Sequence, residues 1–329
     1  MSLTKGYESV KSLFKTPEQP KYITPFESKT RFTMIGAVGA GKTTIAALML
    51  ITAETRSQDE QGFYCNVLEY GSQIREAAWS LRTGHFPPKT VPTGEYAYET
   101  GLEIVSKRFF GEKKVHIPLI DVAGEDQQIM LRKYIGPQAS RNPVNYLTAK
   151  TLLNYMKSSK GFILTLCAPR IPVPGLNLEG EPDGISKFPD VNMSRMLQEV
   201  RNYKKGKNIE AIFVVITKWD ILQPYMIDKY GINLYAPGGI QKFMNVYFPG
   251  TAMQLKHLED KGIVKYYPSH VKLVKDERGQ VEYWAPDDPK VNVVDKIIAE
   301  DGTENPCLLP DYSQASYMAL FDDLEALAS

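Results

Sequence analysis

The sequence is poor in cysteine, histidine and tryptophan, and it carries almost no net charge. It holds 3 cysteines, 4 histidines and 3 tryptophans in 329 residues. Cys65, Cys167 and Cys307 are far apart and show no CxxC spacing, so neither a disulfide framework nor a zinc site is predicted. The 39 basic and 38 acidic side chains leave a charge of +1. This balance gives no electrostatic reason to expect nucleic acid as a partner.

Long apolar runs are also missing. A membrane-spanning helix needs about 18 or more consecutive apolar residues, and the sequence nowhere contains such a run. Neither a signal-peptide pattern nor a lipidation motif is found. We therefore expect a cytoplasmic protein without direct membrane insertion. The apolar share of 43% and the charged share of 23% are those of an ordinary globular protein.

Apolar runs alternate with helical patterns after an N-terminal arm over residues 1–29. Short unbroken runs, such as 162–168 and 211–216, are typical of strands covered on both faces of a parallel sheet. Two runs separated only by Gly111-Glu112 predict an antiparallel hairpin, in which Pro118 weakens the second strand or adds a bulge. The predicted strands are 32–35, 104–110, 115–120, 162–168, 211–216 and 263–267.

This alternation predicts the fold class and most of the core. We expect an α/β fold with a doubly wound, mostly parallel six-stranded sheet that holds one antiparallel strand. A helix after the first strand, a second around residues 74–81 and a third around 193–200 each show one apolar face. A last helix follows Ser313, which is a plausible N-cap.

The strongest motif is GAVGAGKT at residues 36–43, between the first predicted strand and a helix. Its glycines let the main chain bend so that N–H groups surround phosphate oxygens, and the helix adds the positive end of its dipole. Lys42 can contact β- and γ-phosphate oxygens, and the Thr43 hydroxyl can ligate Mg²⁺. A glycine-rich structural turn is the alternative. The predicted nucleotide contacts are Gly36, Ala37, Val38, Gly39, Ala40, Gly41, Lys42, Thr43 and Thr44.

A second motif, DVAG at residues 121–124, ends the second strand of the hairpin. A carboxylate at the end of a strand beside a phosphate loop can hold Mg²⁺ through water, which makes Asp121 a candidate metal ligand. Gly124 can bring its N–H close to a γ-phosphate, where a side chain would clash. Most isolated DxxG sequences are simply turns, so the weight of this motif comes from its place after a phosphate loop.

A third motif, TKWD at residues 217–220, follows the buried run 211–216. The carboxylate of Asp220 can accept hydrogen bonds from N1–H and the N2 amine of guanine. Adenine lacks this donor pair and would leave the carboxylate unpaired. The stem of Lys218 can lie along the base, and Thr217 begins the loop. Taken after the other two motifs, TKWD indicates a guanine site; taken alone, it is an ordinary strand end.

The three motifs, in this order, resemble those of a Ras-like P-loop GTPase of the translation-factor-related class, over residues 31–329. The resemblance implies a switch that binds GTP or GDP with Mg²⁺ and hydrolyses GTP. It also implies a protein effector and an activator, and leaves a nucleotide-dependent dimer open. Residues 30–329 would form one GTPase domain, enlarged by insertions near 55–92, 131–158, 170–190, 222–262 and 276–312.

Further site residues are implied by the resemblance alone. The switch I threonine that joins the Mg²⁺ shell would be Thr90, with Thr93 as the alternative. A base-contacting loop after the sixth strand would fall at Ser269 and His270, where the usual alanine and lysine are replaced. Ser269 fits an ordinary loop residue equally well.

The expected catalysis is slow. Lys42 would stabilise transferred charge, but Glu125 stands where the family often has a water-orienting glutamine, and its carboxylate would face the γ-phosphate as a like charge. Gln127 or Gln128 could substitute. Arg82 is the best-placed internal arginine for the phosphates, although a solvated helix charge is the favoured interpretation. The alternatives are a GTP-bound scaffold with negligible turnover and, less favoured, an ATP-using P-loop enzyme.

Overall fold

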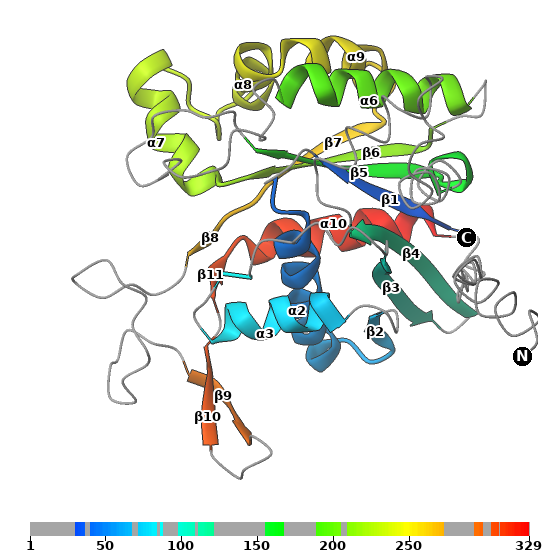
Figure 1. Cartoon of the computed structure of the whole chain (residues 1–329), viewed down its shortest axis with the longest axis vertical. Helices are drawn as coiled ribbons and strands as arrows, with labels where there is room; N and C mark the ends of the chain where they lie inside the picture. Colours follow the sequence, from blue (N-terminus) through cyan, green and yellow to red (C-terminus); the bar gives the residue numbers. More distant parts are fainter. Residues whose placement is uncertain are drawn as a thin grey trace, which may run out of the picture.

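The structure is a computed structural model, and it describes part of the chain. The described residues are 30–36, 40–67, 72–83, 86–87, 98–108, 111–121, 155–167, 189–204, 209–272, 293–298, 304–308 and 310–328. They form an α/β protein with a four-stranded parallel sheet and a separate three-stranded antiparallel sheet (Figure 1). The predicted N-terminal arm lies outside the described residues.

The parallel sheet has the strand order β1-β5-β6-β7. Its strands are β1 (Phe32–Gly36), β5 (Gly161–Cys167), β6 (Ala211–Thr217) and β7 (Val264–Pro268). Every residue of β1 and β6 is buried, as the unbroken apolar runs predict for strands covered on both sides. All of their neighbours run parallel, so the carboxyl ends of the four strands meet at one edge.

Helices cover both faces of this sheet (Figure 1). On one face lie α2 (Lys42–Asp59) and α10 (Gln314–Leu327), with α3 (Ser72–Arg82) packed against α2. On the other face lie α6 (Pro189–Lys204), α7 (Trp219–Tyr230), α8 (Gly239–Tyr247) and α9 (Pro249–Glu259). Two buried clusters fill these layers, one for each face of the sheet. The apolar helix faces predicted around 74–81 and 193–200 are buried, which confirms both helices.

The antiparallel sheet contains β2 (Phe63–Val67), β3 (Tyr98–Arg108) and β4 (Gly111–Asp121), in that order. The predicted hairpin is confirmed as the pair β3–β4. Its turn was expected at Gly111-Glu112, and this was wrong by two residues. Gly111 pairs with Arg108 and Glu112 pairs with Lys107, so both residues already belong to the second strand.

The six predicted strands were expected to form a single sheet, but they are divided between the parallel and the antiparallel sheet. Pro118 explains this break. Strand β4 approaches β1 in one isolated parallel bridge, between Arg31 and His116, where the His116 N–H donates to the Thr30 carbonyl at 2.9 Å. Alternate residues of a strand direct their N–H groups to the same side, so residue 118 would be the next donor toward β1. Proline has no N–H, and the ladder ends at the first bridge.

Two shorter antiparallel pairs complete the described strands. They are β8 (Val271–Lys272) with β11 (Asp311–Tyr312), and β9 (Val293–Ile298) with β10 (Glu304–Leu308). The C-terminal helix α10 begins directly after β11, with Ser313 at the predicted N-cap position. The Ser313 hydroxyl does not cap this helix; it contacts His270 instead.

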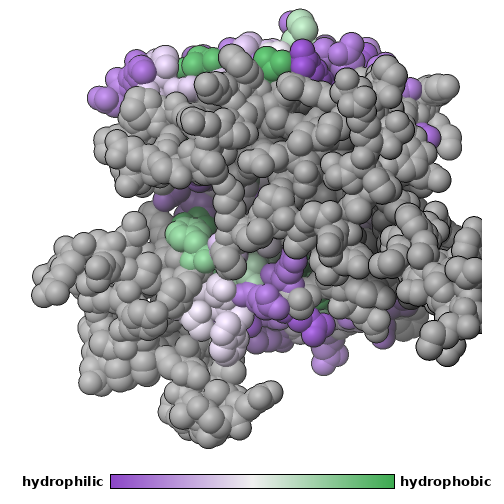
Figure 2. Space-filling view, viewed as in Figure 1, coloured by the Kyte–Doolittle hydropathy of each residue, from purple (hydrophilic) through white to green (hydrophobic). Residues whose placement is uncertain are grey.

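No described helix combines the length and the hydrophobicity that crossing a bilayer would require. In Figure 2, apolar groups on the upper rim, over α8 and α9, are interspersed with hydrophilic ones. Val246 of α8 and Met253 of α9 are 41% and 69% exposed. Scattered exposed apolar side chains of this kind are normal on a protein surface and identify no binding face.

Candidate functional site

Two of the three motifs meet at the carboxyl edge of the parallel sheet. Strand β1 ends at Gly36 and enters the phosphate-loop motif, while β6 ends at Thr217 and enters TKWD. The γ-methyl carbon of Thr217 lies 3.9 Å from the point that a β-carbon on Gly41 would occupy. Ligands of open α/β sheets bind at this edge, next to the strand where the chain changes direction across the sheet.

The N-terminus of α2 is shaped for an anion. Gly41 precedes the helix with φ +83°, a left-handed conformation that favours glycine. Among the described residues, the first turn of α2 has neither a side-chain cap nor an acidic residue. The N–H groups of such a turn can bind an anion. The Lys42 ammonium donates a hydrogen bond to the Gly36 carbonyl at 3.1 Å. Ala37, Val38 and Gly39 lie outside the described residues.

Gly36 stands where two neighbouring segments approach the main chain closely. A β-carbon at this position would lie 2.9 Å from Cβ of Thr165 and 3.0 Å from the Thr165 carbonyl oxygen. It would also lie 3.3 Å from Cγ of Lys42. A residue with a side chain would therefore push β1 away from β5 at the entrance to the phosphate loop, and this explains the first glycine of the motif.

The TKWD segment is held in a strained turn by a buried anchor. Among the described residues, Lys218 is the only non-glycine residue with a positive φ, +59°, which costs roughly 1 kcal/mol or more. Trp219 is 1% exposed and packs edge-on against the rings of Tyr235, at 5.8 Å, and Phe243, at 6.3 Å. Asp220 follows in the first turn of α7, half-buried, and its carboxylate contacts no hydrogen-bond donor or cation among the described residues.

The loop after β7 turns its side chains away from this edge. Ser269 is buried, and its hydroxyl shares a 2.7 Å hydrogen bond with the hydroxyl of Tyr317 in α10. His270 is held by Ser313, whose hydroxyl accepts from the His270 N–H at 2.9 Å and lies 2.7 Å from Nδ1. The main chain of Ser269 contacts TKWD, where its carbonyl accepts from the Trp219 N–H at 3.1 Å.

The predicted metal and catalytic residues are described only in part. Thr43 is the second residue of α2, and Asp121 is the last residue of β4. The offset of the bridge between Arg31 and His116 would place Asp121 level with Gly36 if the strands continued in register. A hydroxyl and a carboxylate are the oxygen donors that Mg²⁺ prefers, so the two residue types fit this ion. Thr90, Thr93, Gly124, Glu125, Gln127 and Gln128 lie outside the described residues.

No group of three or more acidic, histidine or cysteine side chains that could hold a metal occurs within the described part of the chain. A complete protein-only metal cage is therefore not seen there. Mg²⁺ usually takes one or two protein ligands, with water and phosphate oxygens completing its shell.

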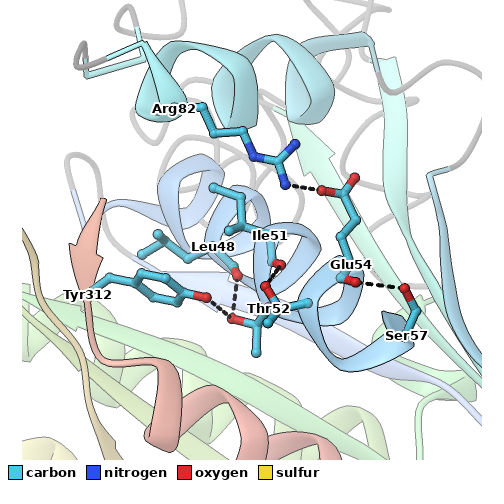
Figure 3. A network of polar contacts seen from close by, with 8 residues as sticks. Leu48, Ile51, Thr52, Glu54, Ser57, Arg82 and Tyr312 are labelled. Carbon is cyan, nitrogen blue, oxygen red and sulfur yellow. Dashed lines mark hydrogen bonds and ion pairs between the residues drawn. The ribbon is translucent and has the colours of Figure 1, made fainter. Parts of the chain in front are cut away.

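Arg82 is bound in place by α2. Its guanidinium donates to the carboxylate of Glu54, and Figure 3 shows the two side chains directed toward each other. Both residues are partly exposed, so Arg82 is neither a free solvated charge nor directed at the phosphate loop in this structure. In the same view, the Thr52 hydroxyl of α2 bonds to the Tyr312 hydroxyl at 3.1 Å, which links α2 to β11 (Figure 3).

Sequence reasoning missed Thr165, which lies beside Gly36 on β5. It is fully buried, and it is level with Gly36 in the strand register. The signal was a single hydroxyl residue within the apolar run 162–168. Only the register shows that this hydroxyl residue neighbours the phosphate loop.

Two comparisons with known proteins found no relative. The sequence matches no protein-family model, and a search of curated proteins returns no match. The function is therefore inferred from the motifs and the geometry of the site.

Proposed function

We propose that this protein is a guanine-nucleotide-binding switch that hydrolyses GTP to GDP and phosphate with Mg²⁺. The observation that carries the proposal is the proximity of Gly41 to Thr217, whose γ-methyl carbon lies 3.9 Å from the point that a β-carbon on Gly41 would occupy. This proximity brings the phosphate motif and the guanine motif together at one sheet edge. A chance glycine turn would not require a base-reading motif beside it. The site belongs to the class in which an anion lies at a helix N-terminus after the first strand of a parallel sheet.

The phosphate side of the site would be formed by α2 and the loop before it. The uncapped N–H groups of the first turn and the ammonium of Lys42 supply positive charge where the triphosphate would lie. Gly36 and Gly41 give the close approach and the left-handed turn that this loop needs.

The base side would be formed by TKWD. The half-buried carboxylate of Asp220 has no other described partner and would accept the N1–H and N2 amine of guanine. The left-handed conformation of Lys218 stores strain at the candidate site, which is where such strain is commonly found. Ser269 would contribute main-chain contacts only, since its hydroxyl is bound to Tyr317.

Mg²⁺ would be held by Thr43 and Asp121, together with Thr90 of the proposed switch I. When bound, this ion neutralises charge on the transferred phosphate. In the finer architecture that we propose, β4 stays alongside β1 beyond their single bridge, without further ladder hydrogen bonds, and brings Asp121 to the phosphate loop. Hydrolysis would be slow without an activator because Glu125 occupies the glutamine position, and Gln127 is the substitute water-orienting residue.

The protein would act through changing protein contacts. A cytoplasmic effector would recognise the GTP-bound surface, and an activating protein would accelerate hydrolysis. A nucleotide-dependent dimer is compatible with the same chemistry. Nothing in the charge balance favours nucleic acid as the partner.

Nucleotide binding tests the proposal directly. The nucleotide that copurifies should be GDP or GTP, and calorimetry with Mg²⁺ should give tighter binding of GTP than of ATP. Asp220→Asn should weaken GTP binding and favour xanthosine triphosphate, because an amide donor matches the carbonyl at C2 of xanthine. Asp228→Asn, an exposed change on the same helix, is the matched control. Equal affinity for GTP and ATP in the unmodified protein would refute a guanine site.

Single-turnover hydrolysis then separates a switch from a scaffold. We expect slow conversion of GTP by the purified protein and acceleration by cell extract. Turnover at tens of events per second without help would contradict the proposed role of Glu125. No turnover under either condition would support the GTP-bound scaffold. Stabilisation by ATP in preference to GTP would instead support an ATP-using enzyme.

A further inference from the structure

Thr165 of β5 lies beside Gly36, the first residue of the phosphate-loop motif. It is level with Gly36 on one side and with Val215 on the other. Residues two apart on a strand share a face, and Ile163 belongs to the buried cluster that also contains the α2 side chains. Thr165 therefore projects toward the face that α2 covers, directly below the start of that helix.

Thr165 is 0% exposed, and its buried hydroxyl has no hydrogen-bond partner among the described residues. Other buried threonines of the sheet and α2 are satisfied. Thr217 donates to the Leu166 carbonyl at 3.2 Å, Thr33 bonds to Ser159 at 2.6 Å, and Thr52 donates to the Leu48 carbonyl at 2.7 Å. A buried unpaired hydroxyl is unfavourable, and valine would have the same shape without this cost.

The side chains of Lys42 and Thr165 both lie next to Gly36. Cγ of Lys42 and Cβ of Thr165 both lie within 3.3 Å of the point that a side chain on Gly36 would occupy. The Lys42 ammonium donates to the Gly36 carbonyl beside them, and an ammonium group has three N–H donors. A hydroxyl oxygen that lacks a partner here is therefore a suitable acceptor for one of them.

We propose that Thr165 is a positioning residue of the phosphate site: its hydroxyl accepts a hydrogen bond from the Lys42 ammonium when the triphosphate is bound. This inference rests on the proposed function. The hydroxyl is unsatisfied without ligand and becomes satisfied with it, so part of the binding free energy comes from pairing a group that is already buried. With one donor on the Gly36 carbonyl and one on Thr165, the third donor of the ammonium is then fixed toward the phosphate oxygens.

The experiment compares three variants in the full-length protein by calorimetry with GTP and inosine triphosphate in Mg²⁺, and by thermal unfolding without nucleotide. Thr165→Val should bind both nucleotides about tenfold more weakly, as expected for a hydrogen bond to a charged group. Its thermal midpoint without nucleotide should be unchanged or higher. Thr165→Ser should restore the affinity. Thr33→Val, the matched control with a satisfied hydroxyl, should lower the midpoint and leave the affinity unchanged.

The outcomes distinguish this inference from the proposed function. If the unmodified protein binds GTP and Thr165→Val binds it equally well, the positioning role is refuted and the nucleotide site stands. A changed ratio of GTP to inosine triphosphate affinity in Thr165→Val would also refute it, because that ratio reports on the base side. A serine variant that remains as weak as the valine variant would show that packing, not the hydroxyl, matters. If the unmodified protein binds no nucleotide, both proposals fall.

Discussion

The carboxylate of Asp190 in α6 caps the N-terminus of α9, a helix that is distant in the sequence. One oxygen of Asp190 accepts from the Gly250 N–H at 2.8 Å. The other accepts from the Thr251 N–H and the Thr251 hydroxyl, each at 2.8 Å. The residue at the N-cap position of α9, Phe248, has no side-chain oxygen that could cap these groups. Replacing Asp190 with alanine should therefore uncap α9 and loosen its packing on α6.

The expected loss of stability in Asp190→Ala depends on which hydrogen-bond donors the substitution leaves unpaired. Thr251 is 0% exposed, so its N–H would lose its partner without access to water, and its hydroxyl would keep only a 3.5 Å contact to the Asp190 carbonyl oxygen. The half-buried Gly250 N–H could be hydrated. Losing an N-cap costs about 0.5–2 kcal/mol, and a hydrogen bond to a charged group is worth about 1.5–3 kcal/mol. We expect Asp190→Ala to lower the free energy of unfolding by about 3 kcal/mol. Asp190→Asn keeps one acceptor oxygen and should lose about half as much.

Urea denaturation followed by circular dichroism measures this free energy. Asp228→Ala removes an exposed carboxylate from α7 and serves as the control, with an expected change within about 0.5 kcal/mol. If Asp190→Ala were no more destabilising than this control, the cap would contribute nothing and our account of the α6–α9 layer would be wrong.

Three further substitutions have defined outcomes. Burial, followed by the charge of Arg31, lowers the pKa of His116 from 6.5 to about 3, so between these values only the unfolded chain takes up the proton. The free energy of unfolding should therefore fall by about 2 kcal/mol from pH 6 to 4.5. His116→Asn should not show this fall, and an unchanged pH dependence in that variant would contradict the lowered pKa. Pro118→Val supplies the missing N–H toward the Phe32 carbonyl and should stabilise the protein by about 1 kcal/mol, with slow hydrogen exchange at residue 118 as the check. Lys218→Gly should raise stability by about 1 kcal/mol in urea denaturation by relieving the positive φ, and should weaken GTP binding; lower stability would argue against strain there.

Local patterns in the sequence were sufficient to predict the elements of the core. The unbroken run 211–216 could only be covered on both faces, and β6 is buried throughout. Ile74, Ala77 and Leu81 share one helical face, and all three are buried in α3. These predictions depend on periodicity alone, which is a property of neighbouring residues.

The remaining features depend on register and on contacts between distant segments. Pro118 was recognised as a problem for its own strand, but its effect falls on the pairing between β4 and β1. The two halves of the Asp190 cap lie in different helices, and no sequence signal connects them. Ser269 was placed in the correct loop, yet its hydroxyl is turned to Tyr317 of α10, a helix that sequence reasoning gave no role at the site.

The way the two sheets are connected sets the order in which they can form. The β3–β4 hairpin closes over the two residues between Arg108 and Gly111, so its loop-closure entropy is small. The pairing of β1 with β5 in the parallel sheet must instead bring Phe32 to Gly161, across more than a third of the sequence. Non-local pairings of this kind are slow. During refolding, the hairpin amides should gain protection first, and the edge that carries Gly36 and Thr217 is assembled only when the two distant strands meet.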